Sequence, residues 1–170
     1  MTSSKKSILN SNLTYVIAFV LPLIMMAALY YTREIFPWGS DCYLRSDMYH
    51  QYAPFFSELW HKIRNGESLL LMGYRMGTNF TSCSHITLQP SNWFVALSTE
   101  IHYRDTECIY NTMIAGSSLS LTYYLTISNN KHVIAAIFGM FYGMSGFIAA
   151  YSWNIMWLDC VILIPLHAWT

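Results

Sequence analysis

The polar segment GSDCYLRSDMYHQYAPFF, residues 39–56, holds the densest group of side chains that could do chemistry. Asp41 and Asp47 stand six residues apart in it, and Arg45 lies between them. A carboxylate in such a place can act as a general base or bind a cation that neutralises a phosphate. The planar guanidinium of Arg45 suits an anionic phosphate. The spacing leaves open a solvated loop whose acids cap the helix that follows.

A second acidic residue, Asp159, lies in WNIMWLDCVILIPL at the start of an apolar segment. An ionisable residue at the entrance of a membrane helix often has a function. It can equally be an interfacial N-cap, and the sequence does not separate these two interpretations.

Motifs for metal, nucleotide or soluble hydrolase chemistry are missing. The six histidines show no HExxH spacing, the four cysteines form no CxxC pair, and there is no P-loop, GxGxxG or GxSxG. We therefore assign no metal ligands. Cys42 and Cys83 are either isolated thiols or a disulfide within one external loop. The formal net charge is zero, which gives no support for nucleic-acid binding.

The composition indicates a membrane protein. Of the 170 residues, 54% are hydrophobic and only 11% are charged, whereas soluble domains carry about 25% charged residues. We expect membrane lipids to be partners of this chain.

The hydropathy pattern predicts three complete transmembrane helices at about 11–31, 108–128 and 133–151, and an incomplete fourth at 160–170. Lys5 and Lys6 place the N-terminus in the cytoplasm by the positive-inside rule. Gly139 and Gly143 form a GxxxG pair suited to close helix packing. Residues 1–170 are thus expected to be the N-terminal part of a larger multi-span transmembrane domain.

The segment between the first two spans, about 33–107, is expected to form an external loop. Within it, the apolar residues of YAPFFSELWHKIRNG recur at helical spacing, which predicts an amphipathic helix at the membrane surface or packed on the bundle. Gly66 is the expected C-cap. The apolar stretch SNWFVALS, residues 91–98, is too short to span a bilayer.

The order of several motifs resembles the N-terminal part of the bacterial YfhO family of large polytopic membrane proteins. The motifs are D-x-x-x-Q-Y-x-P-F-F from Asp47, a Gly-x-Asn-Phe turn at 77–80, Pro90 with Asn92, and YSWNIMWLD from Tyr151 to Asp159. That family is similar to the GT-C glycosyltransferases. The resemblance therefore implies an all-α polytopic membrane protein with a GT-C-like helical bundle in the bacterial cell membrane.

The resemblance also implies an activity, the transfer of sugar from a polyprenyl-phosphate donor to a cell-envelope polymer such as lipoteichoic acid. GT-C enzymes place an acid in the first external loop, which corresponds to Asp47, with Asp41 as second choice for the catalytic role. The resemblance leaves open whether a divalent cation binds beside the phosphate. The residues expected to bind substrate are Arg45, Gln51, Tyr52, Asn79, Asn154 and Asp159.

Two alternatives remain beside this interpretation. One is a non-enzymatic transporter or flippase of lipid-linked sugars, which would need polar residues within the spans. The other is a nonfunctional gene remnant.

Overall fold

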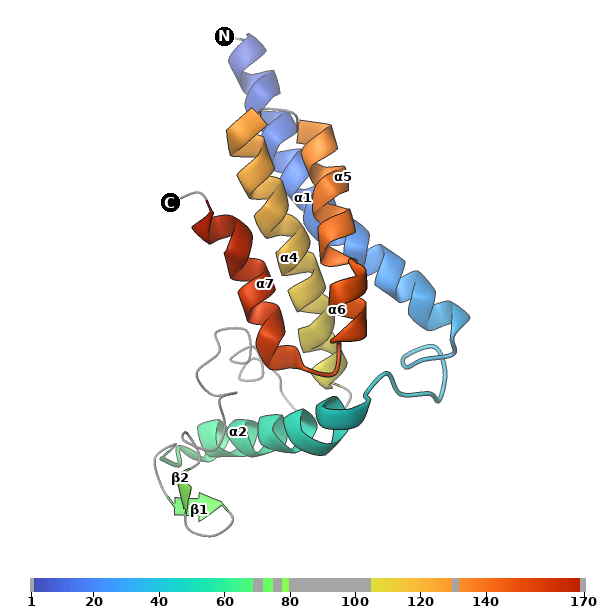
Figure 1. Cartoon of the computed structure of the whole chain (residues 1–170), viewed down its shortest axis with the longest axis vertical. Helices are drawn as coiled ribbons and strands as arrows, with labels where there is room; N and C mark the ends of the chain where they lie inside the picture. The colour runs from blue at the N-terminus through green and yellow to red at the C-terminus, as the bar shows by residue number, and fades with distance from the viewer. Residues whose placement is uncertain (1, 69–71, 75–77, 80–104, 130–131, 169–170) are drawn as a thin grey trace.

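The computed structural model describes residues 2–68, 72–74, 78–79, 105–129 and 132–168 (Figure 1). Among the described residues the regular secondary structure is helical apart from one two-stranded hairpin, which agrees with the expected all-α class. Its elements are α1 (Thr2–Thr32), the π-helix η1 (Met48–Tyr52), α2 (Ala53–Asn65), β1 (Met72–Tyr74), β2 (Thr78–Asn79), α4 (Asp105–Asn129), α5 (His132–Gly143), α6 (Gly146–Ala150) and α7 (Ile155–His167).

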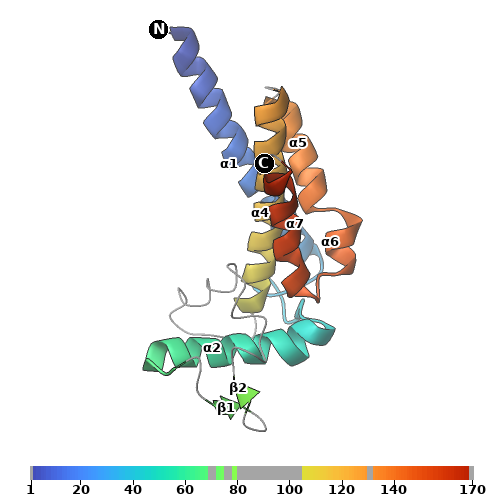
Figure 2. The ribbon, with the colours of Figure 1, turned by 60° about the vertical axis from the view of Figure 1, so that its left-hand side comes forward.

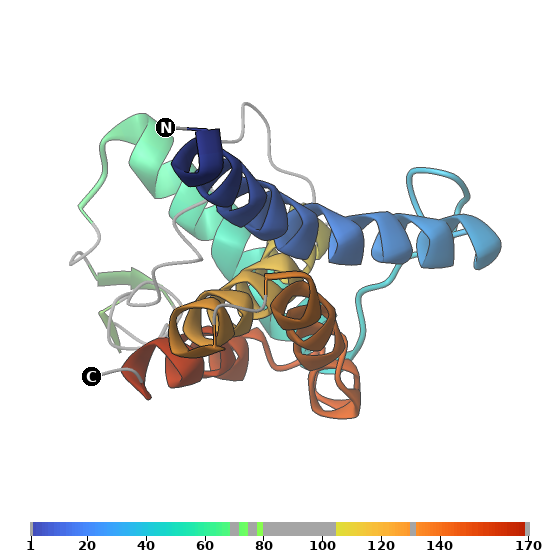
Figure 3. The same cartoon turned by 90° about the horizontal axis from the view of Figure 1, so that it is seen from above.

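The long helices form a bundle in which α4 is central. It packs against α1, α5 and α7, and α1 also packs against α5 (Figure 3). The N-terminus of α1 lies far from α2, which runs across the opposite end of the bundle (Figures 1 and 2). Because α1 ends there and α4 and α7 begin there, we call it the α2 end.

Two segments are long and apolar enough to cross a bilayer, Asn12–Thr32 and His132–Ala150. Only 28% of the most apolar window of each is buried inside the protein, whereas the core helix of a soluble protein is mostly buried. Large apolar side chains cover their exposed surfaces, among them Val16, Ile24, Val133 and Phe141. Exposed apolar side chains in this number call for lipid or further protein to cover them.

The expected second span, 108–128, lies within α4, and here the prediction of three complete spans is not confirmed. The helix has 25 residues, which is long enough, but it is not among the segments apolar enough to span. The reason is its central place, because α4 buries hydroxyl side chains against its neighbours: Ser117, Ser118, Ser120, Thr122 and Thr126. The shorter apolar helix Trp157–His167 lies where the incomplete fourth span is expected.

Polar contacts and close backbone approach hold α4 in the bundle. The hydroxyl of Ser118 donates a 2.7 Å hydrogen bond to the carbonyl of Ala18 in α1. The Thr122 hydroxyl lies 3.3 Å from the carbonyl of Ala135 in α5. Gly143 has no room for a Cβ atom, which would lie 2.6 Å from the carbonyl oxygen of Ile114, and a Cβ atom at Gly139 would collide with Thr122. The GxxxG pair is therefore a packing face.

The predicted amphipathic helix is confirmed in α2. Phe56 and Leu59 are buried, and Gly66 ends the helix in the left-handed conformation with φ 66°. Lys62 is buried as well, against expectation for a lysine, and pairs with Glu58 at 3.6 Å and Glu67 at 3.5 Å. The apolar stretch 91–98 and Cys83 lie outside the described residues.

Candidate functional site

The chain that leaves α1 turns sharply before it reaches the polar segment. The backbone N–H of Phe36 donates to the carbonyl of Asp41, and that of Asp41 donates to the carbonyl of Glu34. Gly39 lies inside this turn, where a Cβ atom would collide with the backbone of Glu34. The turn therefore requires glycine at 39, and it sets the backbone position of Asp41.

Four of the predicted site residues, Asp41, Arg45, Asp47 and Gln51, are exposed. Asp47 stands at the N-cap position of η1 but makes no capping hydrogen bond with its side chain. Capping therefore does not occupy this carboxylate. Arg45 contributes its backbone carbonyl, which accepts the N–H of Met48 at 2.9 Å, while its side chain stays at the surface.

Two predicted site residues are brought into direct contact. The hydroxyl of Tyr52 donates a 2.9 Å hydrogen bond to Oδ1 of Asn154, which lies 102 positions later in the sequence. Tyr52 ends η1 and is almost fully buried, and Asn154 is the N-cap residue of α7. The bond therefore fixes the polar segment to the start of α7.

The last two predicted residues have different surroundings. Asp159 lies in the second turn of α7 and is buried, with 8% of its surface exposed. Asn79 lies in β2, opposite Met72 of β1. Figures 1 and 2 place this hairpin on the side of α2 that faces away from the bundle, so its strand is not beside the start of α7.

Glu107 in the first turn of α4 is a site residue that the sequence analysis missed. Only 3% of its surface is exposed. Its Oε1 accepts the backbone N–H of Tyr43 at 2.8 Å and the thiol of Cys42 at 3.4 Å. The only sequence signal was an acid at the start of an apolar helix, because its partner lies 64 positions away. This carboxylate anchors the polar segment to α4.

Three tyrosines extend the same contact. The rings of Tyr43 and Tyr110 stack with centroids 5.3 Å apart, and the Tyr30 ring lies 5.4 Å from that of Tyr43. The Tyr30 hydroxyl donates a 3.3 Å hydrogen bond to Oδ1 of Asn111 in α4. Aromatic contacts thus join α1, the polar segment and α4 at the α2 end.

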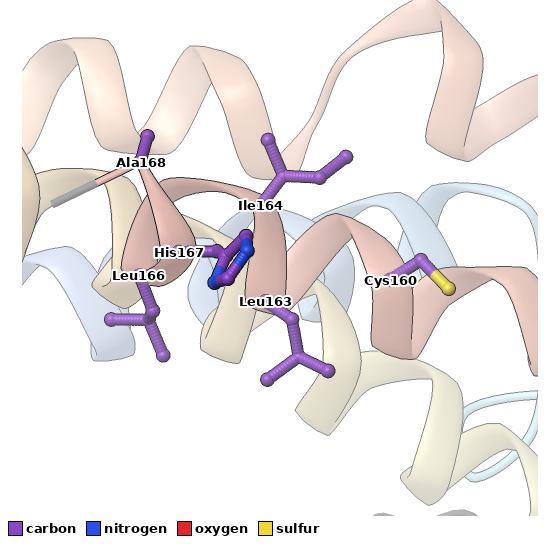
Figure 4. A pocket seen from close by; sticks show the side chains of 6 residues that line it. All are labelled: Cys160, Leu163, Ile164, Leu166, His167 and Ala168. Atoms are coloured by element: carbon purple, nitrogen blue, oxygen red, sulfur yellow. The ribbon is translucent and has the colours of Figure 1, made fainter. Parts of the chain in front are cut away.

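A cavity of about 740 Å³ lies along α7, and its lining includes none of these residues. Figure 4 shows its lining side chains. Its lining comes from α7 and the residue after it, and is mostly apolar: Cys160, Leu163, Ile164, Leu166, His167 and Ala168. It offers no carboxylate, so none of the acidic residues expected from the sequence to act as a base lines it. Within the described ranges, no three His, Cys, Asp or Glu side chains are grouped so that they could hold a metal ion.

The model of the family described as bacterial membrane protein YfhO matches residues 18–170. No curated protein matches the chain, and no solved structure does.

Proposed function

The chain belongs to the YfhO family of bacterial membrane proteins, and on this premise we propose that the full-length protein is a glycosyltransferase. It takes a sugar from a polyprenyl-phosphate carrier and attaches it to a cell-envelope polymer such as lipoteichoic acid. A lipid carrier suits a site outside the cytoplasm because nucleotide sugars are not available there.

The proposed topology puts the N-terminus in the cytoplasm and the α2 end outside. Lys5 and Lys6 support it through the positive-inside rule, and Lys131 follows α4 in the sequence on the same proposed side. In this topology α1, α4 and the α5–α6 pair cross the membrane, and α7 enters it as the start of a fourth span. The protein is then a multi-pass protein whose polar segment faces the envelope.

Asp47 is the proposed general base. Its carboxylate takes the proton of an acceptor hydroxyl while that oxygen bonds to C1 of the sugar. The bond from C1 to the carrier phosphate breaks, and polyprenyl phosphate leaves with the electron pair. Exposure of Asp47 supports this role, because a bulky polymer has to reach the base. Arg45, two residues earlier in the sequence, is the proposed partner of the phosphate.

The observation that carries the proposal is the hydrogen bond between Tyr52 and Asn154. It holds the segment with Asp47 and Gln51 against the start of α7, near which Asp159 is buried. A catalytic group on an otherwise mobile segment would lose much of the advantage of fixed geometry. A cation would need ligands from the substrate phosphate beside Asp47, so we assign the base role first.

A transporter or flippase of lipid-linked sugars is the second candidate. Its support would be the hydroxyl groups buried along α4. Ser118 and Thr122, however, use their hydroxyls on backbone carbonyls of the bundle. These contacts give them a structural role and favour chemistry at the α2 end.

The test uses cells that lack the full-length protein. Wild type, Asp47→Asn and Asp41→Asn are restored at equal membrane abundance, and sugar on the extracted envelope polymers is measured by mass spectrometry. We expect wild type and Asp41→Asn to restore the sugar, and Asp47→Asn to lower it by at least about a hundredfold.

The other results separate the alternatives. Equal restoration by all three variants would remove Asp47 from the mechanism, and loss only with Asp41→Asn would move the base to Asp41. If wild type leaves the polymers unchanged, the transferase proposal fails, and transport of a lipid-linked sugar becomes the next assay.

A further inference from the structure

Four aromatic residues surround the turn between α6 and α7. The ring centroid of Tyr151 lies 4.9 Å from that of Phe147 and 5.3 Å from that of Trp157. The Trp153 ring stacks on the Tyr151 ring with centroids 6.1 Å apart. We call these four residues the aromatic turn. Phe147 is 50% exposed and Trp157 45% exposed, so the aromatic turn forms part of the surface.

Backbone hydrogen bonds fix the aromatic turn. The N–H of Tyr151 donates to the carbonyl of Phe147 at 3.0 Å, and the N–H of Asn154 donates to the carbonyl of Tyr151 at 2.9 Å. The N–H of Trp157 donates to the carbonyl of Asn154 at 3.2 Å. These backbone donors are satisfied within the turn itself, so the chain that carries the rings is held in place.

The polar side chains of the same segment are engaged inside the protein. Oδ1 of Asn154 accepts the hydroxyl of Tyr52, and Ser152 is buried. A sugar-binding surface would need polar side chains beside the rings to bond the sugar hydroxyls. Here Phe147 and Trp157 are exposed while those polar groups are not. The arrangement therefore favours a partner that is largely apolar.

The aromatic turn also lacks charge. Residues 133–158 contain no Asp, Glu, Lys or Arg, whereas residues 33–47, which follow α1, contain five. Both segments reach the α2 end of the bundle (Figures 1 and 2). Trp and Tyr gather at the level of the lipid headgroups, because their rings combine an apolar body with one polar group. The contrast indicates that the charged segment meets water and the aromatic turn meets lipid.

The length of the preceding span places the aromatic turn at the same level. The span His132–Ala150 has 19 residues, which at about 1.5 Å per residue cover about 28 Å. This length matches a hydrocarbon core of about 30 Å. Tyr151 follows directly after the span, so it lies at the boundary between the hydrocarbon core and the headgroups.

We propose that the aromatic turn is anchored among the headgroups of the phospholipid bilayer and holds the polar segment at the same depth. The Tyr52–Asn154 hydrogen bond links the two, because Asn154 lies in the turn and Tyr52 in the polar segment. The anchoring holds for either orientation of the chain, since lipid headgroups cover both faces of a membrane. One further step rests on the proposed function: this depth is where the phosphate of a lipid carrier lies, beside Asp47.

Spin labels at exposed positions measure this depth. The full-length protein, in a cysteine-free background, carries a nitroxide on Ala150→Cys beside the aromatic turn, on His50→Cys in the polar segment, or on Phe141→Cys within the span. It is reconstituted in vesicles of phosphatidylglycerol and phosphatidylcholine. Collision rates with oxygen, which prefers lipid, and with a nickel chelate, which stays in water, give the depth of each label. Lipids labelled on the headgroup or on the acyl chain calibrate the depth.

We expect the labels at positions 150 and 50 to lie within about 7 Å of the lipid phosphate, roughly the thickness of one headgroup layer, and the label at position 141 to lie in the hydrocarbon core. Replacing both exposed rings, Phe147→Ala together with Trp157→Ala, should move the first two labels toward water. Their collision rates with the nickel chelate should rise at least about twofold. Phe138→Ala, which removes a comparably exposed ring from within the span, should leave both labels unchanged.

The proposal is overturned if the label at position 150 collides with the nickel chelate as freely as in buffer, or lies as deep as the label at position 141. Shielding from both reagents would show that further protein covers the turn, and immobilisation by added glucose or N-acetylglucosamine would assign the rings to a sugar. Either result, or unchanged depth after loss of both rings, also overturns it. A label at position 50 in bulk water would remove the link to the polar segment.

These results are distinct from failure of the transferase proposal, which is measured as sugar on the envelope polymers. Headgroup depth of both labels without sugar transfer would leave the anchor standing and reject the transferase. Transfer by a protein whose label at position 150 lies in water would do the reverse.

Discussion

The hydroxyl of Tyr52 lies 2.9 Å from Oδ1 of Asn154, and this hydrogen bond joins η1 to the first residues of α7. Around it, Met48, Tyr52 and Phe56 pack in one apolar cluster with Tyr110, Ile148 and Ile155 of the bundle: the polar bond sits beside an apolar contact. Docking of the polar segment therefore depends on both.

The Tyr52–Asn154 bond can be tested by removing each partner. Tyr52→Phe keeps the ring and loses the hydroxyl, and we expect a loss of about 1–2 kcal/mol in unfolding free energy, because Oδ1 of Asn154 loses its donor. Asn154→Ala should cost a similar amount, and the double variant less than the sum of the two. The measurement is thermal or denaturant unfolding in detergent. Strict additivity of the two losses would show that the bond contributes nothing.

Removal of the Glu107 carboxylate should release the polar segment from α4. In Glu107→Ala the N–H of Tyr43 loses its acceptor, and trypsin should then cut after Arg45 at least several-fold faster than in wild type. Glu67→Ala serves as control, because Glu67 is exposed and belongs to α2's own ion pairs. Equal cleavage rates in the three proteins would argue against an anchoring role.

The glycines of α5 should tolerate no side chain. Gly139→Ala and Gly143→Ala place a methyl group against the backbone of α4. We expect each to lower the unfolding free energy by about 1–3 kcal/mol through overpacking. Gly146→Ala is the matched control, since a Cβ atom there meets nothing within 4 Å. The unfolding free energies of the three variants are compared in detergent. A decrease in Gly146→Ala as large as in the other two would point to a general effect of alanine.

The proposed topology can be tested with one pair of isosteric substitutions. In a cysteine-free background, Ser40→Cys lies in the turn after α1 and Ser128→Cys lies near the far end of α4, and both positions are exposed. A membrane-impermeant maleimide added to intact cells should label the first and not the second, while both react after lysis. The reverse pattern would invert the topology.

Local patterns predicted the elements that depend on nearby residues. The run before Thr32 is apolar for about 20 residues, as a span requires, and the spacing around Phe56 and Leu59 together with Gly66 defines α2 and its end. The GxxxG pair was likewise readable, because small residues at that spacing leave one open face on a helix.

The sequence analysis did not predict the features that depend on packing between distant segments of the chain. Hydropathy predicted a complete span in α4, which is not confirmed, because this helix buries hydroxyl side chains against the helices that surround it. Glu107 looked like the end of a loop and is a buried anchor, because its partner Tyr43 comes from a distant segment. The spacing of residues in the sequence could also not predict that Asp47 is exposed and that its side chain does not cap η1.

The polar character of α4 has a consequence for biogenesis. The translocon releases a helix into lipid according to its hydrophobicity, and α4 alone falls short of what the two apolar segments reach. In the proposed topology we expect α4 to be inserted as a helical hairpin with the apolar α5, which covers its hydroxyls. In an insertion assay, α4 by itself should be largely translocated across the membrane. The segment of α4 followed by α5 should remain in the bilayer.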